Sequence, residues 1–134
     1  VIVREQFGKD KKEDSHRSRG YGVANVGLHF AILVNGGSAS ASEILAGALR
    51  EHGVAKLVGE KTYGKGSVQE LVPITDTTSL KVTIARWLTP NGVSISEGGL
   101  TPDFEIKQPP PDEIKPGTDP QLDKAVELLL QGKI

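Results

Sequence analysis

The sequence contains neither cysteine nor methionine, and its 134 residues include only one tryptophan, two tyrosines and three phenylalanines. Because there is no cysteine, disulfide bonds, thiol nucleophiles and thiolate metal sites are all excluded. The three histidines, His16, His29 and His52, share no spacing that is typical of metal ligands. The composition therefore predicts neither a metal site nor a disulfide framework.

The sequence also lacks an excess of charge of one sign and lacks long apolar runs. The formal net charge is only −1, which argues against a nucleic-acid partner. No apolar run approaches the length of a membrane span, and the start does not resemble a signal peptide. A chain of this length with 37% hydrophobic residues predicts one domain with one core. Because it begins with Val1 inside an apolar run, we expect it to be a piece of a longer protein.

Residues 31–51 are the most informative stretch, and they predict a strand, a tight turn and a helix. Residues 31–34 are apolar, residues 35–37 read Asn-Gly-Gly, and residues 44–49 supply an apolar helical face. Three serines lie where the helix begins. A helix N-terminus offers unpaired N–H groups and a partial positive charge, so a serine there has an oxyanion stabiliser beside it. The alternative is a capping box formed by Ser40 and Glu43, and this stretch alone leaves both interpretations open.

The remaining segments are weaker signals. Residues 4–27 are rich in charge of both signs and are expected to form a mobile loop or hairpin. Short strands are expected at 55–58, from 67 onward, at 79–88 and at 104–106, with 93–96 returning as a hairpin partner after a turn at 89–92. We expect residues 1–107 to form the core, 108–118 a proline-rich linker and 119–132 a C-terminal helix.

A partial phosphate-binding pattern follows the strand at 55–58. Gly59, Gly64 and Lys65 match most of G-x-x-x-x-G-K-[ST]. The pattern fails at Gly66, where a magnesium-binding hydroxyl is needed, and the residues from Ser67 onward alternate like a strand instead of opening a helix. Nucleotide binding is therefore not favoured.

A serine nucleophile needs a base, and none of the histidines lies in an obviously suitable context. Lys65 lies between two glycines that let the backbone pass close to its neighbours. A lysine acts as a base at neutral pH only when burial or positive neighbours bring its pKa to roughly 7 to 8. The amide of Gln69 is suitably spaced to orient such a lysine. The alternative is an ordinary surface lysine in a glycine loop.

Four motifs in order give the chain a family resemblance. They read N-x-x-S-A-S-A-S-E at 35–43, K-T-Y-G-K-G-S-V-Q at 61–69, T-P-x-G at 89–92 and G-L-x-P-D at 99–103. Together they resemble the carboxyl-terminal processing (tail-specific) serine proteases, densely over residues 28–106. The resemblance implies an α/β fold: part of a crotonase/Clp-protease-like core, a mixed sheet with a helix after the nucleophile turn, and a C-terminal helix.

The resemblance also implies roles for particular residues. Ser40 corresponds to the family's nucleophile, Lys65 to its general base and Gln69 to the residue that positions the lysine. The N–H of Ala41 corresponds to one oxyanion donor. The second donor comes from an upstream D-L-R-x-N-P-G-G motif, which lies outside this chain. No metal or cofactor is implied.

The implied function is cleavage of protein or peptide substrates near unstructured C-terminal tails, through a Ser-Lys dyad. A PDZ domain is expected in the missing N-terminal part, and without it and the second oxyanion donor the fragment is expected to be inactive alone. Similar proteases are periplasmic or otherwise extracytoplasmic, and some are associated with membranes. Two alternatives stay open: a non-catalytic ligand-binding or interaction module, as in the similar domains of the retinoid-binding protein of the retina, and a Ser-His-Asp hydrolase.

Overall fold

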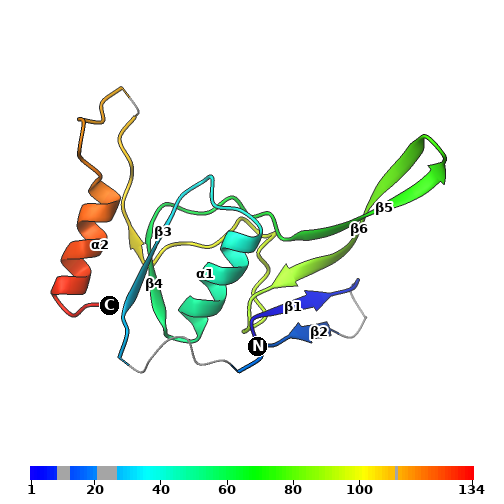
Figure 1. Cartoon of the computed structure of the whole chain (residues 1–134), viewed down its shortest axis with the longest axis horizontal. Coiled ribbons are helices and arrows are strands. Elements are labelled where there is room, and N and C mark those ends of the chain that lie inside the picture. The colour runs from blue at the N-terminus through cyan, green and yellow to red at the C-terminus, as the bar shows by residue number, and fades with distance from the viewer. Residues whose placement is uncertain (9–12, 21–26, 111) are drawn as a thin grey trace.

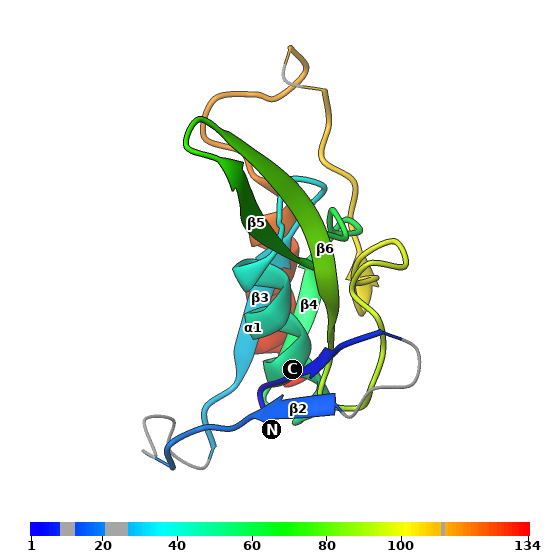
Figure 2. The same ribbon diagram turned by 90° about the vertical axis from the view of Figure 1, so that its right-hand side faces the viewer.

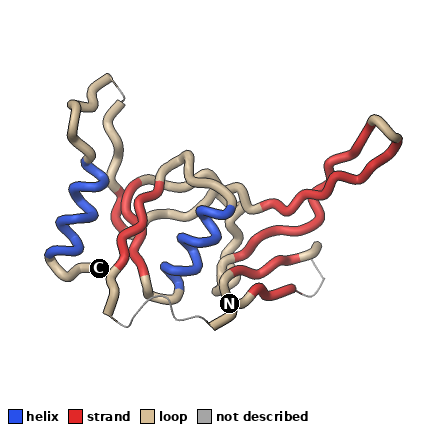
Figure 3. The backbone as a smooth tube through the Cα atoms, in the orientation of Figure 1, coloured by secondary structure: helices blue, strands red, loops and turns tan. Residues whose placement is uncertain are grey.

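The structure is a computed structural model that describes residues 1–8, 13–20, 27–110 and 112–134. The described residues form two helices and two sheets, whose arrangement Figures 1 and 3 show. In chain order, the elements are β1 (Val3–Gln6), β2 (Glu13–His16), β3 (Phe30–Val34), α1 (Ala41–Glu51), β4 (Ala55–Gly59), β5 (Ser67–Thr75), β6 (Thr78–Leu88), β7 (Phe104–Glu105) and α2 (Pro120–Leu130).

A parallel sheet in the order β3-β4-β7 forms the centre of the molecule. Successive residues of a strand face opposite sides of a sheet, and β4 is apolar on both. Leu57 packs in one cluster with Ala46 of α1, whereas Val58 packs in another with Ala125 and Leu128 of α2. The two helices therefore cover opposite faces of the sheet (Figure 1), and α1 connects β3 to β4 as the crossover that parallel strands require.

An antiparallel sheet in the order β2-β1-β6-β5 lies beside this core. Its strands β5 and β6 form a long hairpin that extends away from both helices (Figure 1). Strands β1 and β2 lie beside the C-terminal end of β6 (Figure 2), where Arg4 pairs with Leu88. Residues 60–66, which we call the lysine loop, connect the end of β4 to the base of this hairpin, where Ser67 pairs with Arg86.

The α/β class and its two helices are confirmed, with the parallel and antiparallel strands divided between two sheets. The segment expected at 93–96 returns antiparallel after the turn, as an isolated bridge between Leu88 and Ser94 and not as a regular strand. The N–H of Thr89 donates to the Val93 carbonyl (2.8 Å), while the N–H of Val93 donates to the Thr89 hydroxyl (3.1 Å).

The boundaries of the three expected units stay predictions. Within 4–27, β1 and β2 pair as an antiparallel hairpin, while residues 9–12 and 21–26 lie outside the described residues, as does residue 111 of the expected linker. The C-terminal helix begins where expected, because the Asp119 carboxylate accepts hydrogen bonds from the N–H groups of Gln121 and Leu122 (both 3.1 Å). Neither helix of the described chain has the length and apolar character needed to cross a membrane.

Candidate active site

Ser40 occupies a strained turn between β3 and α1. Its φ of 57° and ψ of −115° make it the one non-glycine residue with a positive φ among the described residues. Such a conformation costs on the order of 1 to 3 kcal/mol and persists only where the surrounding contacts impose it. Strained strand-to-helix turns of this kind expose the side-chain oxygen of a nucleophilic serine in hydrolases. The next residue, Ala41, is the first of α1, and its N–H has no partner in the described part of the chain.

The Glu43 carboxylate connects this turn to the lysine loop. The side chain is fully buried, and each of its oxygens accepts two hydrogen bonds. One oxygen, Oε2, accepts from the backbone N–H groups of Ser40 and Lys65, both at 2.9 Å. The other, Oε1, accepts from the N–H of Gly64 at 2.7 Å and from the hydroxyl of Thr62 at 2.5 Å. Four donors satisfy the buried charge, and the backbones of Ser40 and Lys65 are thereby fixed to one atom.

The Thr62 hydroxyl extends this network to a third loop. It donates to Glu43 and accepts from the N–H of Leu100 at 2.7 Å, while the N–H of Thr62 donates to the Leu100 carbonyl at 3.0 Å. The backbones meet so closely that a Cβ on Gly64, whose φ is 89°, would lie 2.8 Å from the nitrogen of Gly99. Glycine at both positions lets the lysine loop lie against the loop before β7.

The predicted site residues are brought together to different degrees. Ser40 and Lys65 share the Glu43 oxygen, and the N–H of Tyr63 also donates to the carbonyl of Ser38, at 3.0 Å. Gln69 lies further along, in β5, and its side-chain nitrogen donates to the Thr83 hydroxyl at 3.4 Å. In the described residues, no hydrogen bond joins the side chains of Ser40, Lys65 and Gln69. The backbones of Ser40 and Lys65 are thus held close together, with the side chains of Lys65 and Gln69 exposed.

The sequence predicts only part of the role of Glu43. The capping box assigned it to the start of the helix, and its bond to the Ser40 N–H fulfils that role. The bonds to the lysine loop and the contribution of Thr62 were missed. One signal was available: Glu43 and the buried Ala46 and Gly47 lie on one face of α1, so helical periodicity places the carboxylate inside the protein. A carboxylate in the interior needs donors from elsewhere in the chain.

The histidines lie away from the serine turn. His52 ends α1, whose eleven residues span about 16 Å, and its side-chain nitrogen Nε2 contacts the carbonyl of Val1 at 2.6 Å. His16 pairs with Glu5 at 3.2 Å and packs edge-on against Trp87. His29 precedes β3, at the end opposite to Ser40. The Ser-His-Asp alternative therefore has no support in the described residues, nor do they contain a group of three or more acidic or histidine side chains that is placed to hold a metal ion.

Comparison with known proteins agrees with this arrangement. Residues 1–106 match peptidase family S41. The carboxy-terminal-processing protease of Bartonella bacilliformis is 49% identical over 84 residues, which cover 63% of this chain and 19% of that protein. The carboxyl-terminal-processing protease of Synechocystis is 43% identical over 113 residues, which cover 83% of this chain and 26% of that protein. The chain thus spans only about a fifth to a quarter of the length of these relatives.

Among solved structures, the photosystem II D1 C-terminal processing protease superposes with a TM-score of 0.55 at 45% identity, over 57% of this chain and 20% of that one. The family match covers most of the chain, including the serine turn, the Glu43 network and the lysine loop. The chain therefore belongs to peptidase family S41, with the carboxyl-terminal processing proteases as its relatives.

Proposed function

We propose that this chain carries the nucleophile and the base of a serine peptidase. The observation that supports the proposal most is the Glu43 carboxylate, which holds the backbones of Ser40 and Lys65 at one oxygen atom. The strained backbone at Ser40 adds to it, as does the N–H of Ala41, which has no partner in the described part of the chain. A serine, an amine and an oxyanion donor on adjacent backbone segments are the parts that acyl transfer needs.

The proposed reaction proceeds through an acyl-enzyme. The neutral Lys65 amine takes the proton of the Ser40 hydroxyl while the serine oxygen bonds to the scissile carbonyl carbon. The resulting oxyanion is stabilised by the N–H of Ala41 and by the partial positive charge at the start of α1. As the carbon–nitrogen bond breaks, the lysine ammonium returns the proton to the leaving amine. Water then attacks the ester by the same route, so that the new carboxyl end leaves and Ser40 is restored.

We further propose that the substrates are proteins with unstructured C-terminal tails, cut outside the cytoplasm with the help of a PDZ domain elsewhere in the protein. The relatives are carboxyl-terminal processing proteases, and this supports the substrate class. An extended tail also suits the site, because the serine turn and the lysine loop lie at the surface rather than inside a closed cavity.

Cleavage is expected to depend on a free tail. An active form of the protein, whether this chain or a longer form containing it, should cut an unfolded polypeptide ending in a free apolar tail at least tenfold faster than the same polypeptide with its ends joined, because only a free end can enter the site as an extended strand. Mass spectrometry of the products measures the rate and the position of the cut. Equal rates for the linear and the circular substrates would contradict the tail-directed function while leaving peptidase activity intact.

The 134-residue chain alone is expected to show little or no peptidase activity. It offers one proposed oxyanion donor, and loss of one such donor typically costs about a hundredfold to a thousandfold in rate. The measurement is hydrolysis of an unfolded fluorogenic protein by the chain, with the Ser40→Ala variant as the blank. Robust cleavage that disappears in that variant would show that the chain needs no further donor.

A further inference from the structure

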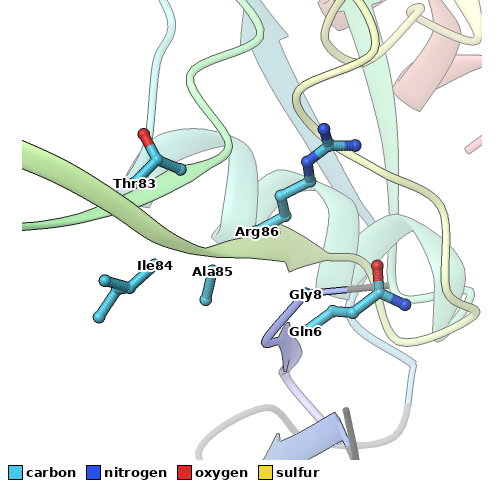
Figure 4. A pocket seen from close by; sticks show the side chains of 6 residues that line it. All are labelled: Gln6, Gly8, Thr83, Ile84, Ala85 and Arg86. Atoms are coloured by element: carbon cyan, nitrogen blue, oxygen red, sulfur yellow. The ribbon is translucent and has the colours of Figure 1, made fainter. Parts of the chain in front are cut away.

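Strand β6 contains an irregularity near the base of the β5–β6 hairpin, next to the lysine loop. Val68 pairs with Ala85 and Gln69 pairs with Thr83, so Ile84 has no partner on β5. This is a β-bulge, in which one extra residue bends the strand and changes which side chains share a face. Figure 4 shows the result: the side chains of Thr83 and Arg86 point to one side of β6, and those of Ile84 and Ala85 to the other.

The bulge brings Thr83 to the face that carries Gln69. Directly opposite residues of an antiparallel pair have their Cβ atoms about 4.5 to 5.5 Å apart and on the same side. The Gln69 side-chain nitrogen Nε2 donates to the Thr83 hydroxyl oxygen at 3.4 Å. Thr83 and Arg86 are three positions apart, so in a regular strand without a bulge their side chains would lie on opposite faces of β6. The bulge thus places the side chain of Thr83, which contacts Gln69, on the same face of the sheet as that of Arg86 at the base of the hairpin (Figure 4).

We propose that Thr83 is a positioning residue for the peptidase reaction, acting through Gln69 on Lys65. The proposal rests on the proposed function, in which Lys65 is the base and Gln69 orients it. Two threonines contact this system: the Thr62 hydroxyl donates to Glu43, which holds the lysine loop, and the Thr83 hydroxyl accepts from the Gln69 amide, the group proposed to orient Lys65.

The proposed role of Thr83 depends on which end of the Gln69 amide is free to bind Lys65. A glutamine side chain has one acceptor end and one donor end, and a lysine in either protonation state offers N–H groups. With its nitrogen donating to Thr83, the Gln69 amide keeps its oxygen free, and the oxygen is the end that is able to accept a hydrogen bond from a lysine. If the side-chain amide rotated so that its nitrogen and oxygen exchanged places, it would present N–H groups to the lysine instead. The contact at 3.4 Å is long, as hydrogen bonds of catalytic groups often are before substrate binds.

The test compares Thr83→Val, which removes only the hydroxyl, with Thr83→Ser, which keeps it. In an active form of the protein, we expect Thr83→Val to lower kcat about three- to tenfold, the factor that one ordinary hydrogen bond contributes. KM is expected to stay within twofold, because Thr83 acts on the base and not on substrate binding. Thr83→Ser is expected to restore most of kcat. Steady-state kinetics on a fluorogenic peptide give both parameters.

Thr77→Val is the matched control, since Thr77 lies in the turn of the same hairpin and its hydroxyl makes no hydrogen bond in the described residues. It should leave kcat unchanged. Wild-type kcat in Thr83→Val would overturn the proposal, as would an equal loss in Thr83→Val and Thr83→Ser or a change confined to KM. If Lys65→Arg kept normal turnover, the proposed function itself would fail, and that result is distinguishable because it does not involve Thr83.

Discussion

Replacing Lys65 by arginine is expected to abolish peptide hydrolysis as completely as replacing Ser40 by alanine. Arginine keeps the positive charge and much of the length of the side chain, but it cannot lose its proton and so cannot accept one from the serine hydroxyl. We expect kcat/KM of an active form of the protein to fall on the order of ten-thousandfold or more, as when members of other catalytic units are removed.

This variant isolates the side-chain chemistry of Lys65 from its structural role. The bond to Glu43 comes from the backbone N–H of Lys65, so the loop should keep its place in Lys65→Arg. An unchanged melting temperature and circular dichroism spectrum would verify that. Lys61→Arg provides the control, because Lys61 is an exposed lysine of the same loop with no part in the proposed reaction. Near-normal turnover in Lys65→Arg would remove this lysine as the base.

Local sequence signals were sufficient for the strand–turn–helix unit. The apolar residues before Asn35 and the helical periodicity after Ser40 are short-range patterns, and the structure forms β3 and α1 within one or two residues of the expected bounds. The same is true of α2, whose start follows from one capping aspartate and a proline at the first position. These elements need little information from the rest of the chain.

The parts that escaped prediction depend on contacts between distant residues. Glu43 meets donors 19 to 22 positions away, so no local pattern shows that one carboxylate joins the serine turn to the lysine loop. The bulge at Ile84 is set by how β6 pairs with β5, and the alternation of apolar residues alone predicts an unbroken strand. The pairing expected at 93–96 is likewise limited to one bridge, between Leu88 and Ser94, while the Val93 N–H donates to the Thr89 hydroxyl.

Replacing Glu43 by glutamine is expected to impair both stability and activity. Glutamine has nearly the same shape, but its NH₂ group must face two of the four donors that the carboxylate satisfies. Each buried donor left without an acceptor costs about 1 to 3 kcal/mol, so the loss of two acceptors should lower the free energy of unfolding by roughly 2 to 6 kcal/mol. Chemical denaturation of the chain measures this loss.

The Glu97→Gln control separates the loss of a charge from the loss of the network, because Glu97 is exposed and its side chain makes no hydrogen bond in the described residues. It should change the free energy of unfolding by no more than about 0.5 kcal/mol. Thr62→Val, which removes one donor of the network and leaves the Leu100 N–H without its acceptor, should fall between the two variants.

The activity of Glu43→Gln distinguishes a general support of the fold from a specific link between the two catalytic segments. Under conditions where the variant is fully folded, a role confined to stability leaves kcat unchanged. We expect kcat to fall on the order of a hundredfold instead, because displacing the serine or the lysine by about 1 Å is enough to cause such a loss. A folded Glu43→Gln protein with normal kcat would show that the turn and the loop keep their places without the shared carboxylate, and the main support for the proposed dyad would then be lost.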